Sequence, residues 1–416
     1  MFILPIIITA LGGFLLIKLH FFPMLHPWRT AHGMLDAVAE DGGYRSLALA
    51  LAGTLGVGNI FGVAIAISLG GAGAVLWLFI SGIFASVIKY AEATVCADLT
   101  ATDGQGGMMY AIERNLPAGK PLGKAYAFTC IALSLIMGAA MQSSAAISSA
   151  SLVLGGGRLY PLIFVFLTAV LILGDRERIK WATAILVPLA AVIYLVLTVT
   201  VIIKNAATLP VIISEIFEST FTTPAVCGGT LGSLMTSPVV RGFATGILSN
   251  EAGAGTSSMA HTSGTSHHPS DAGLLGMCEV FFDTAILCTL TALAILTSVR
   301  EPLGTASARL VVDALSSAMP GGGYLIALSV ATFALATAVC WYFYGRVSLG
   351  YLTGRGGEAF LALYLAFVGL GGVFDCSGFA AVADVLLLVL TLLCAPVIIK
   401  SSDRIRALSE LRGLLK

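Results

Sequence analysis

The sequence predicts an all-α membrane protein, because its composition and its pattern of apolar runs both require lipid as the main solvent. Of its 416 residues, 57% are hydrophobic and only 11% are charged, whereas an ordinary soluble domain carries roughly 25% charge. The apolar runs recur along the whole chain, and short polar stretches separate them. A single soluble core stops growing near roughly 250 to 300 residues, so we expect the runs to face lipid or one another.

Eleven apolar windows predict eleven transmembrane helices, since roughly 20 residues are needed to cross about 30 Å of hydrocarbon. The windows start near residues 1, 46, 72, 124, 160, 181, 240, 271, 322, 357 and 378. No basic segment precedes the first window and no obvious cleavage site of small residues follows it. We therefore interpret that window as a retained helix and not as a signal peptide.

The distribution of positive charge predicts the orientation of the chain. With the N-terminus outside, the inner loops and the tail collect most of the Lys and Arg residues. The outer side then receives only Arg158, Lys204, Arg241, Arg300 and Arg309. This bias satisfies the positive-inside rule in one orientation, so we expect a multi-pass protein of the cell membrane with a cytoplasmic C-terminus. The 22 basic and 22 acidic residues balance, so no bulk charge would recruit nucleic acid.

Two predicted spans carry glycine-rich stretches that weaken helix continuity. The second span contains Gly53, Gly56, Gly58, Asn59 and Gly62. The seventh contains Ser249, Asn250, Glu251, Gly253 and Gly255. Irregular backbone at membrane depth is tolerated only where it lines a cavity or is buried in protein, so two breaks predict a buried polar site. The alternative is that the glycines form Gly-x-x-x-Gly packing faces between helices.

The positions of the two breaks predict an inverted repeat. Each broken span opens a set of five helices, residues 46–204 and 240–400, and an odd number of helices inverts the second set. The rest is an extra N-terminal helix with an inner linker (1–45), an outer linker (205–239) and a cytoplasmic amphipathic tail (401–416). Amides at the ends of half-helices suit a carboxylate, and freed oxygens suit an ammonium group or a cation. A zwitterion therefore fits such a site.

Several stretches of the sequence resemble the alanine or glycine:cation symporter family. They are residues 56–64, 70–73, 106–110, 241–242, 249–253 and 279–284. The most specific is the Ser-Asn-Glu-Ala-Gly segment that starts at Ser249. The resemblance covers nearly the whole chain. It implies the leucine-transporter fold of five-plus-five inverted helices, with broken first and sixth core helices and one extra N-terminal helix, and it implies sodium-coupled uptake of alanine or glycine.

The breaks and the resemblance together supply the candidate site. The expected substrate-binding residues are Gly56, Gly58, Asn59, Gln142, Gly253, Gly255 and Trp341. The expected cation-binding residues are Asn59, Thr337, Ser249 and Asn250. The resemblance alone implies that Gln142 reaches the substrate, that Thr337 binds sodium and that Trp341 forms a pocket wall. The alternatives are a helix-bridging hydrogen bond for Asn59, helix packing for Gln142 and a bond to its own helix for Thr337.

Carboxylates inside a membrane span need a functional or structural reason. For Glu251 and Asp283, one functional reason to consider is a relay for protons or cations. Our preferred interpretation of Glu251 is that free amides at the break bind it, so that it holds the unwound segment in shape.

We expect no cofactor and no structural metal, with sodium as the coupling ion. His261, His267 and His268 lie in an inner loop that has no partner cysteines and no ordered set of carboxylates. The eight cysteines are scattered and are expected to pack as small apolar residues.

These patterns predict a secondary transporter that imports a small neutral amino acid with sodium by alternating access, working as a monomer in the lipid bilayer. A symporter that uses protons or another small solute is the alternative, and a channel would need an open conduit. An enzyme is not expected, because the spans hold no nucleophile with a base, no paired catalytic aspartates and no His-Glu-x-x-His motif.

Overall fold

The computed structural model describes residues 3–56, 58–100, 106–174, 176–220, 237–262, 268–299, 302, 304, 307–354, 357–374 and 377–415. Within these residues the chain forms helices and no strand, which confirms the predicted all-α class. The first half contains α1 (Ile3–Lys18), α2 (Phe22–Leu25), α3 (Pro27–Ala39), α4 (Gly43–Thr54), η1 (Gly58–Gly62), α5 (Val63–Gly70), α6 (Ala74–Asp98), α7 (Met108–Asn115), α8 (Gly119–Leu133), η2 (Ser134–Met141), α9 (Gln142–Leu154), α10 (Tyr160–Ile172) and α11 (Arg176–Lys204).

The remaining helices include two that lie between the halves, η3 (Ala206–Thr208) and α12 (Leu209–Thr220). The second half contains α15 (Pro238–Asn250), α16 (Ser258–His261), α17 (Pro269–Val280), η4 (Phe281–Cys288), α18 (Thr289–Ser298), α19 (Ser307–Ser316), α20 (Gly322–Thr353), α21 (Glu358–Val373), η5 (Ser377–Phe379), α22 (Ala380–Lys400) and α23 (Ser402–Leu411). The segments η1, η2 and η4 are π-helices that continue into α-helices.

Six continuous helices of the described chain are long and apolar enough to cross a membrane. They are α6, Gly119–Leu154, α11, Pro269–Ser298, α20 and α22. The bent pair of α4 and Gly58–Gly70, whose axes differ by 52°, adds a seventh candidate. The shorter helices α1, α10, α15 and α21 occupy the other predicted windows. The chain is thus a multi-pass membrane protein, while the count of eleven spans stays a prediction.

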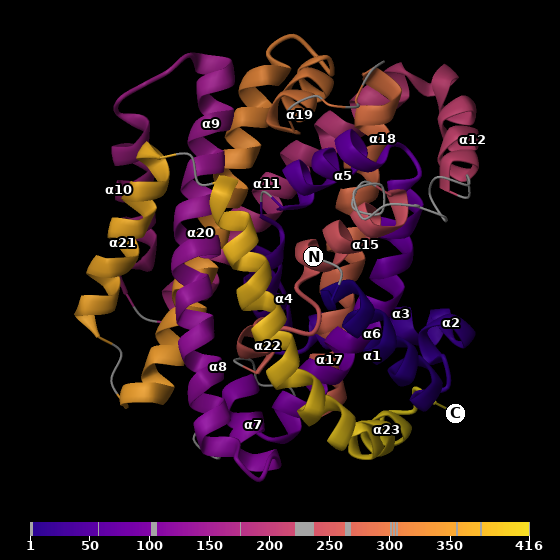
Figure 1. Cartoon of the computed structure of the whole chain (residues 1–416), viewed down its shortest axis with the longest axis vertical. Coiled ribbons are helices and arrows are strands. Elements are labelled where there is room, and N and C mark those ends of the chain that lie inside the picture. The colour runs from indigo at the N-terminus through magenta and orange to yellow at the C-terminus, as the bar shows by residue number, and fades with distance from the viewer. Residues whose placement is uncertain are drawn as a thin grey trace.

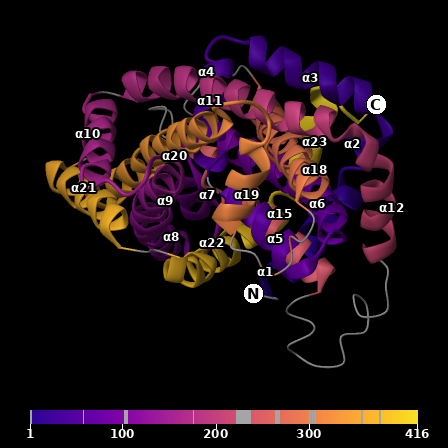
Figure 2. The same cartoon turned by 90° about the horizontal axis from the view of Figure 1, so that it is seen from above.

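The two halves contain the same order of elements (Figure 1). In each half a broken pair is followed by two long helices, a short apolar helix and a final long helix. Helices α10 and α21 lie together at one flank, whereas α2, α3 and α12 lie at the other in both views (Figure 2). Helix α20 is the most enclosed span, with 72% of its apolar window buried. The inverted relation between the halves stays a prediction.

Glycines allow α15 to pack directly on α6. A Cβ atom at Gly242 would lie 2.2 Å from the carbonyl oxygen of Ala74, and one at Gly246 would lie 1.9 Å from Ser81 Oγ. These two glycines are four residues apart, so they lie on one face of α15. The seventh predicted span therefore contains a Gly-x-x-x-Gly packing face, but it precedes the break.

Replacing Gly242 by valine is expected to destabilise the protein by about 1–3 kcal/mol or more, because the clash is with backbone atoms that no rotamer change can relieve. Thermal unfolding of the purified protein in detergent measures the effect. Gly13→Val is the control, since a Cβ atom at Gly13 meets no atom within 4 Å. Equal unfolding temperatures for the two variants would contradict the packing described above.

Candidate functional site

The first break lies between α4 and η1. The amide of Gly56 donates to the carbonyl of Thr54 at 2.7 Å, so the α-helical ladder stops there; Val57 lies outside the described residues. A Cβ atom at Gly56 would lie 3.1 Å from Thr337 Oγ1 and 3.2 Å from Gln142 Oε1. At Gly58, in contrast, a Cβ atom would meet nothing within 4 Å. The alternative of tight glycine packing is therefore wrong for Gly58.

The second break covers residues 251–257, between α15 and α16. Glu251 has a left-handed backbone with φ of 52°, and Gly253 and Gly255 have φ of 93° and 71°, values that favour glycine. The amide of Ala252 donates to Asn250 Oδ1 at 3.1 Å, and Tyr126 donates its hydroxyl to the carbonyl of Ala254 at 2.8 Å. Side chains of α15 itself and of α8 thus bind backbone groups that the break releases, as membrane depth requires.

Glu251 binds the unwound segment through a side chain and not through the free amides that we expected from the sequence. Its Oε2 accepts a bond from Thr256 Oγ1 at 2.7 Å, and its Oε1 has no partner among the described atoms. The backbone amide of Gly255, which has no partner in a helix ladder, donates instead to Glu92 Oε1 at 3.2 Å. Glu92 lies on α6 and is one turn from Lys89; the signal that could have indicated it was this pair of charges inside an apolar window.

Oxygen atoms from three helices meet between the two breaks. Ser249 Oγ lies 2.8 Å from Asn59 Oδ1 and 2.7 Å from Asp283 Oδ2. The side-chain nitrogen Nδ2 of Asn59 donates to Asp283 Oδ1. All three residues are buried. Since a hydroxyl has one proton, Ser249 donates to one of its two neighbours at a time, so acceptor oxygens outnumber donor protons around it.

Two further residues complete this oxygen cluster. Thr284 Oγ1 donates to Asp283 Oδ2 at 2.8 Å, and Asn250 Nδ2 donates to Thr284 Oγ1 at 3.2 Å. Asp283 and Thr284 belong to η4, and π-helical segments occur frequently at functional sites. The sequence marked Asp283 as an intramembrane carboxylate but did not place it beside Asn59. Carboxylate, amide and hydroxyl oxygens are the hard donors that bind sodium in transporters.

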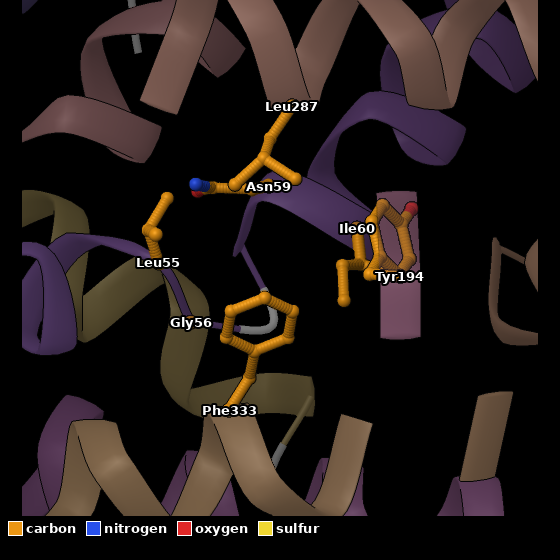
Figure 3. A pocket seen from close by; sticks show the side chains of 7 residues that line it. All are labelled: Leu55, Gly56, Asn59, Ile60, Tyr194, Leu287 and Phe333. Carbon is orange, nitrogen blue, oxygen red and sulfur yellow. The ribbon is translucent and has the colours of Figure 1, made fainter. Parts of the chain in front are cut away.

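A small pocket adjoins the oxygen cluster (Figure 3). It is lined by Leu55, Gly56, Asn59, Ile60, Tyr194, Leu287 and Phe333. The pocket is closed in this conformation and leaves essentially no space for even a water molecule, whereas sites for drug-sized ligands hold roughly 300–1,000 Å³. In Figure 3 the Phe333 ring lies beside Gly56, while Tyr194 and Ile60 are neighbours on one side. The walls are mostly apolar, and they must move apart before a solute can bind between them.

The remaining predicted residues lie around this pocket to different extents. Gln142 Nε2 donates to the carbonyl of Met137 at 3.2 Å, and Thr337 Oγ1 donates to that of Phe333 at 2.9 Å; both side chains adjoin Gly56. Trp341 is buried and its Nε1 donates to the carbonyl of Gly53 at 3.3 Å. It is not among the described residues that line the pocket.

Gly253 and Gly255 pack away from the pocket. A Cβ atom at Gly253 would lie 2.4 Å from Ile8 Cδ1, and one at Gly255 would lie 2.9 Å from Met108 Cβ. The structure therefore places Asn59, Ser249 and Asn250 in the oxygen cluster, whereas these two glycines shape the second break.

A separate cluster of charged side chains holds the short helix α16. Lys89 Nζ lies 3.0 Å from Glu279 Oε1 and 2.7 Å from Ser257 Oγ, and His261 Nε2 lies 2.8 Å from Glu279 Oε2. The charged side chains are at most 1% exposed. His261 thus binds a carboxylate, and His268 accepts the amide of Ser270 at the start of α17; His267 lies outside the described residues. No group of metal ligands was found within the described part of the chain.

Lys89→Met is expected to destabilise the protein by about 3–5 kcal/mol, because it leaves the buried carboxylate of Glu279 without its countercharge. The double variant Lys89→Met, Glu279→Gln should recover most of this loss, since the amide oxygen can still accept from His261. Thermal unfolding in detergent measures both, with Lys124→Met on the exposed face of α8 as the control. An unchanged unfolding temperature for the single variant would show that the cluster of Lys89, Glu279 and His261 does not stabilise the protein.

Comparisons with known proteins agree with this architecture. A family model described as the sodium:alanine symporter family matches residues 1–408. The sodium/alanine symporter AgcS of Methanococcus maripaludis is 31% identical over 341 residues, which are 78% of this chain and 73% of that protein. A sodium/proton-dependent alanine carrier protein of Bacillus sp. (strain PS3) is 29% identical over 348 residues, 78% of this chain and 77% of that protein.

One solved structure extends the comparison to the fold. MhsT in complex with L-phenylalanine superposes with a TM-score of 0.60 at 14% identity, over 85% of this chain and 87% of that chain. At this identity the likeness concerns the fold alone. MhsT has the leucine-transporter fold that the sequence resemblance implied.

Proposed function

Because the chain belongs to the sodium:alanine symporter family, we propose that it imports a small neutral amino acid, alanine or glycine, together with sodium by alternating access. The predicted family is confirmed, and it is a family of transporters and not of enzymes. The observation that carries the proposal is the buried oxygen cluster of Asn59, Ser249 and Asp283, which lies between two broken helices and beside a pocket of small volume.

Sodium binds at this oxygen cluster. An ionised carboxylate at the position of Asp283 is costly in a membrane interior unless a countercharge is near, and the described contacts of Asp283 are neutral donors. A sodium ion among Asp283, Asn59 Oδ1 and Ser249 Oγ supplies that charge. Thr337 contributes its hydroxyl oxygen from the Gly56 side, whereas Asn250 orients Thr284 and the second break.

The amino acid binds at the first break. The amides at the start of η1 have no preceding turn to bond, and they carry the positive end of the helix dipole. The carboxylate of the substrate lies at these amides, next to Gly58, where open space allows a close approach. Gln142 completes the polar wall, and the apolar side chains of Leu55, Ile60 and Phe333, which close on one another in this conformation, face the small side chain of the substrate once the pocket opens.

The protein works in the bilayer as a monomer, with its N-terminus outside and its C-terminus in the cytoplasm. The sodium gradient supplies the driving force.

Asp283→Asn is expected to raise the sodium concentration for half-maximal uptake about tenfold or more, since bonds to a charged group are worth about 1.5–3 kcal/mol. Uptake of radiolabelled L-alanine into proteoliposomes under an inward sodium gradient measures this shift. Asp313→Asn, on the exposed surface of α19, is the matched control. Asn59→Ala tests the same cluster. Normal sodium dependence in both Asp283→Asn and Asn59→Ala would show that sodium does not bind at this position. Saturable uptake separates a carrier from a channel.

Proton coupling is a second candidate, because Glu251 Oε1 is buried without a described partner and the relative from Bacillus sp. is named sodium/proton-dependent. A buried carboxyl group with one oxygen left without a donor holds either a proton or a cation. Separate sodium and proton gradients distinguish the two candidates. Alanine uptake that a proton gradient drives without sodium, and that Glu251→Gln abolishes, would replace sodium by protons as the coupling ion.

A further inference from the structure

The pocket beside the oxygen cluster is closed, and its walls come from different groups of helices. Leu287 belongs to η4, whereas Phe333 belongs to α20. A solute can bind only when these walls move apart, so some contacts between the groups must break in a transport cycle. The strength of the contacts within each group indicates which helices stay together.

Helices α6, α15, α16 and α17, with its continuation η4, form the first unit. Glycines bring two of them onto the backbone of α6: a Cβ atom at Gly276 would lie 2.9 Å from the carbonyl oxygen of Lys89, and Gly242 is as close to α6. The Nζ atom of Lys89 also binds Glu279 of α17 and Ser257 beside α16. Separating a buried ion pair leaves two uncompensated charges, so we expect these helices to move together.

Helix α8, its continuation η2 and α20 form the second unit. A Cβ atom at Gly138 would lie 2.1 Å from Trp341 Cβ, and one at Gly345 would lie 2.6 Å from Ser134 Oγ. Glycines on both helices thus allow the close packing that holds membrane helices together. In both views α8 and α20 lie to the left of α6 and α15 (Figures 1 and 2). The pocket closes between the two units.

One peptide group of the second break joins the two units. Its N–H, from Gly255, donates to Glu92 Oε1 of the first unit at 3.2 Å. Its carbonyl, from Ala254, accepts from Tyr126 Oη of the second unit at 2.8 Å. The N–H and C=O groups of a trans peptide point in opposite directions, so this buried group connects α6 on one side with α8 on the other.

The carbonyl of Ala254 has a second donor. Cys394 Sγ of α22 lies 3.3 Å from the same oxygen, and a carbonyl oxygen can accept two bonds. A carbonyl that loses every donor at membrane depth is costly. The thiol therefore allows Tyr126 to move away while the carbonyl keeps a partner.

Helix α22 is attached to the first unit by the tail helix α23, which follows it in the chain. Arg404 of α23 lies 2.9 Å from Asp98 of α6, and Arg412 lies 2.7 Å from the buried Asp271 of α17. Cys394 thus belongs to a helix whose inner end is fixed to the same unit as the break, whereas Tyr126 does not.

We propose that Tyr126 is a positioning residue that acts in only one state of the transport cycle. Its hydroxyl binds the carbonyl of Ala254 while the pocket is closed and releases it when the two units separate, and Cys394 then remains as the donor. Glu92 keeps its bond to Gly255 in both states. This role rests on the proposed function, because it requires that the pocket opens during transport.

Alkylation of Cys130 measures the separation of the two units. Cys130 is buried and lies one turn after Tyr126 on the same face of α8, so N-ethylmaleimide reaches it only after α8 has moved away from the break. Mass spectrometry of peptides from the purified protein in detergent gives the alkylation rate, well below the unfolding temperature.

Tyr126→Phe removes a bond of the closed state only, so we expect Cys130 to react about two- to tenfold faster, the effect of one hydrogen bond on the equilibrium. Cys394→Ala is the matched control, since it removes a donor from the same carbonyl in both states and should leave the rate unchanged. An unchanged rate in Tyr126→Phe would overturn the proposal, and so would equal acceleration in both variants, which would show a purely structural bond.

The wild type provides a test that does not depend on the folding of any variant. We expect Cys130 to react slowly in the folded protein, and more slowly when sodium and alanine are present, because bound solutes favour the closed state. If Cys130 reacts in denaturant but in no condition that keeps the protein folded, the units do not separate at Tyr126 and the proposal fails.

Uptake of alanine into proteoliposomes separates this role from the proposed function. We expect the half-maximal alanine concentration to rise about two- to tenfold in Tyr126→Phe without a fall in the maximal rate, and to stay at the wild-type value in Cys394→Ala. Equal values in the two variants would overturn the role of Tyr126. If the wild type itself does not transport alanine, the proposed function fails, while the alkylation rates still decide whether the bond of Tyr126 breaks.

Discussion

The structure depends on one constraint: in hydrocarbon, every polar group of the backbone must find a partner within the protein. At the second break, backbone groups that no longer bond within a helix bond to side chains of α6, α8 and α15. These side chains are Glu92, Tyr126 and Asn250. The break is therefore specific to its neighbours and could not exist in an isolated helix. The polar groups that bind the backbone also fix where the candidate ligands of α15 point.

Helix α17 and its continuation η4 connect the two polar clusters of the interior. Glu279 joins α17 to α6 and α16 through Lys89 and His261, while Asp283, one turn further along, joins η4 to Asn59 and Ser249. One cluster is held by an ion pair between side chains and the other by neutral donors around a carboxylate. The first arrangement is balanced in charge and suits a structural role, whereas the second lacks a positive charge and suits a transported cation.

Much of the fold could be predicted from the sequence, because hydropathy and glycine density are local properties. The helical spans and both breaks follow from them, and Asn59, Ser249 and Asn250 were selected as candidates because they adjoin the breaks. The partnership of Asn59 with Asp283 could not be predicted, since 224 residues separate the two and no periodicity relates them. Glu92 was missed although its charge lies in an apolar window one turn from Lys89, because its partner, the backbone amide of Gly255, leaves no mark in the sequence. The expected substrate contacts of Gly253 and Gly255 were assigned from the break and the family resemblance, and neither distinguishes a backbone that faces a ligand from one that packs against Met108.

The three π-helical segments occur where the candidate ligands are: η1 contains Asn59, η2 ends next to Gln142, and η4 contains Asp283. Each π-helical turn accommodates one residue more than an α-helical turn. Removing a single residue from η4 would let the wide turn close to an α-helical one, so the helix beyond it would keep its orientation, but Asp283 would lose its position opposite Asn59. Natural insertions and deletions should therefore be excluded from these short segments even where substitutions are accepted, so that the spacing of the chain, and not only its chemistry, is under selection.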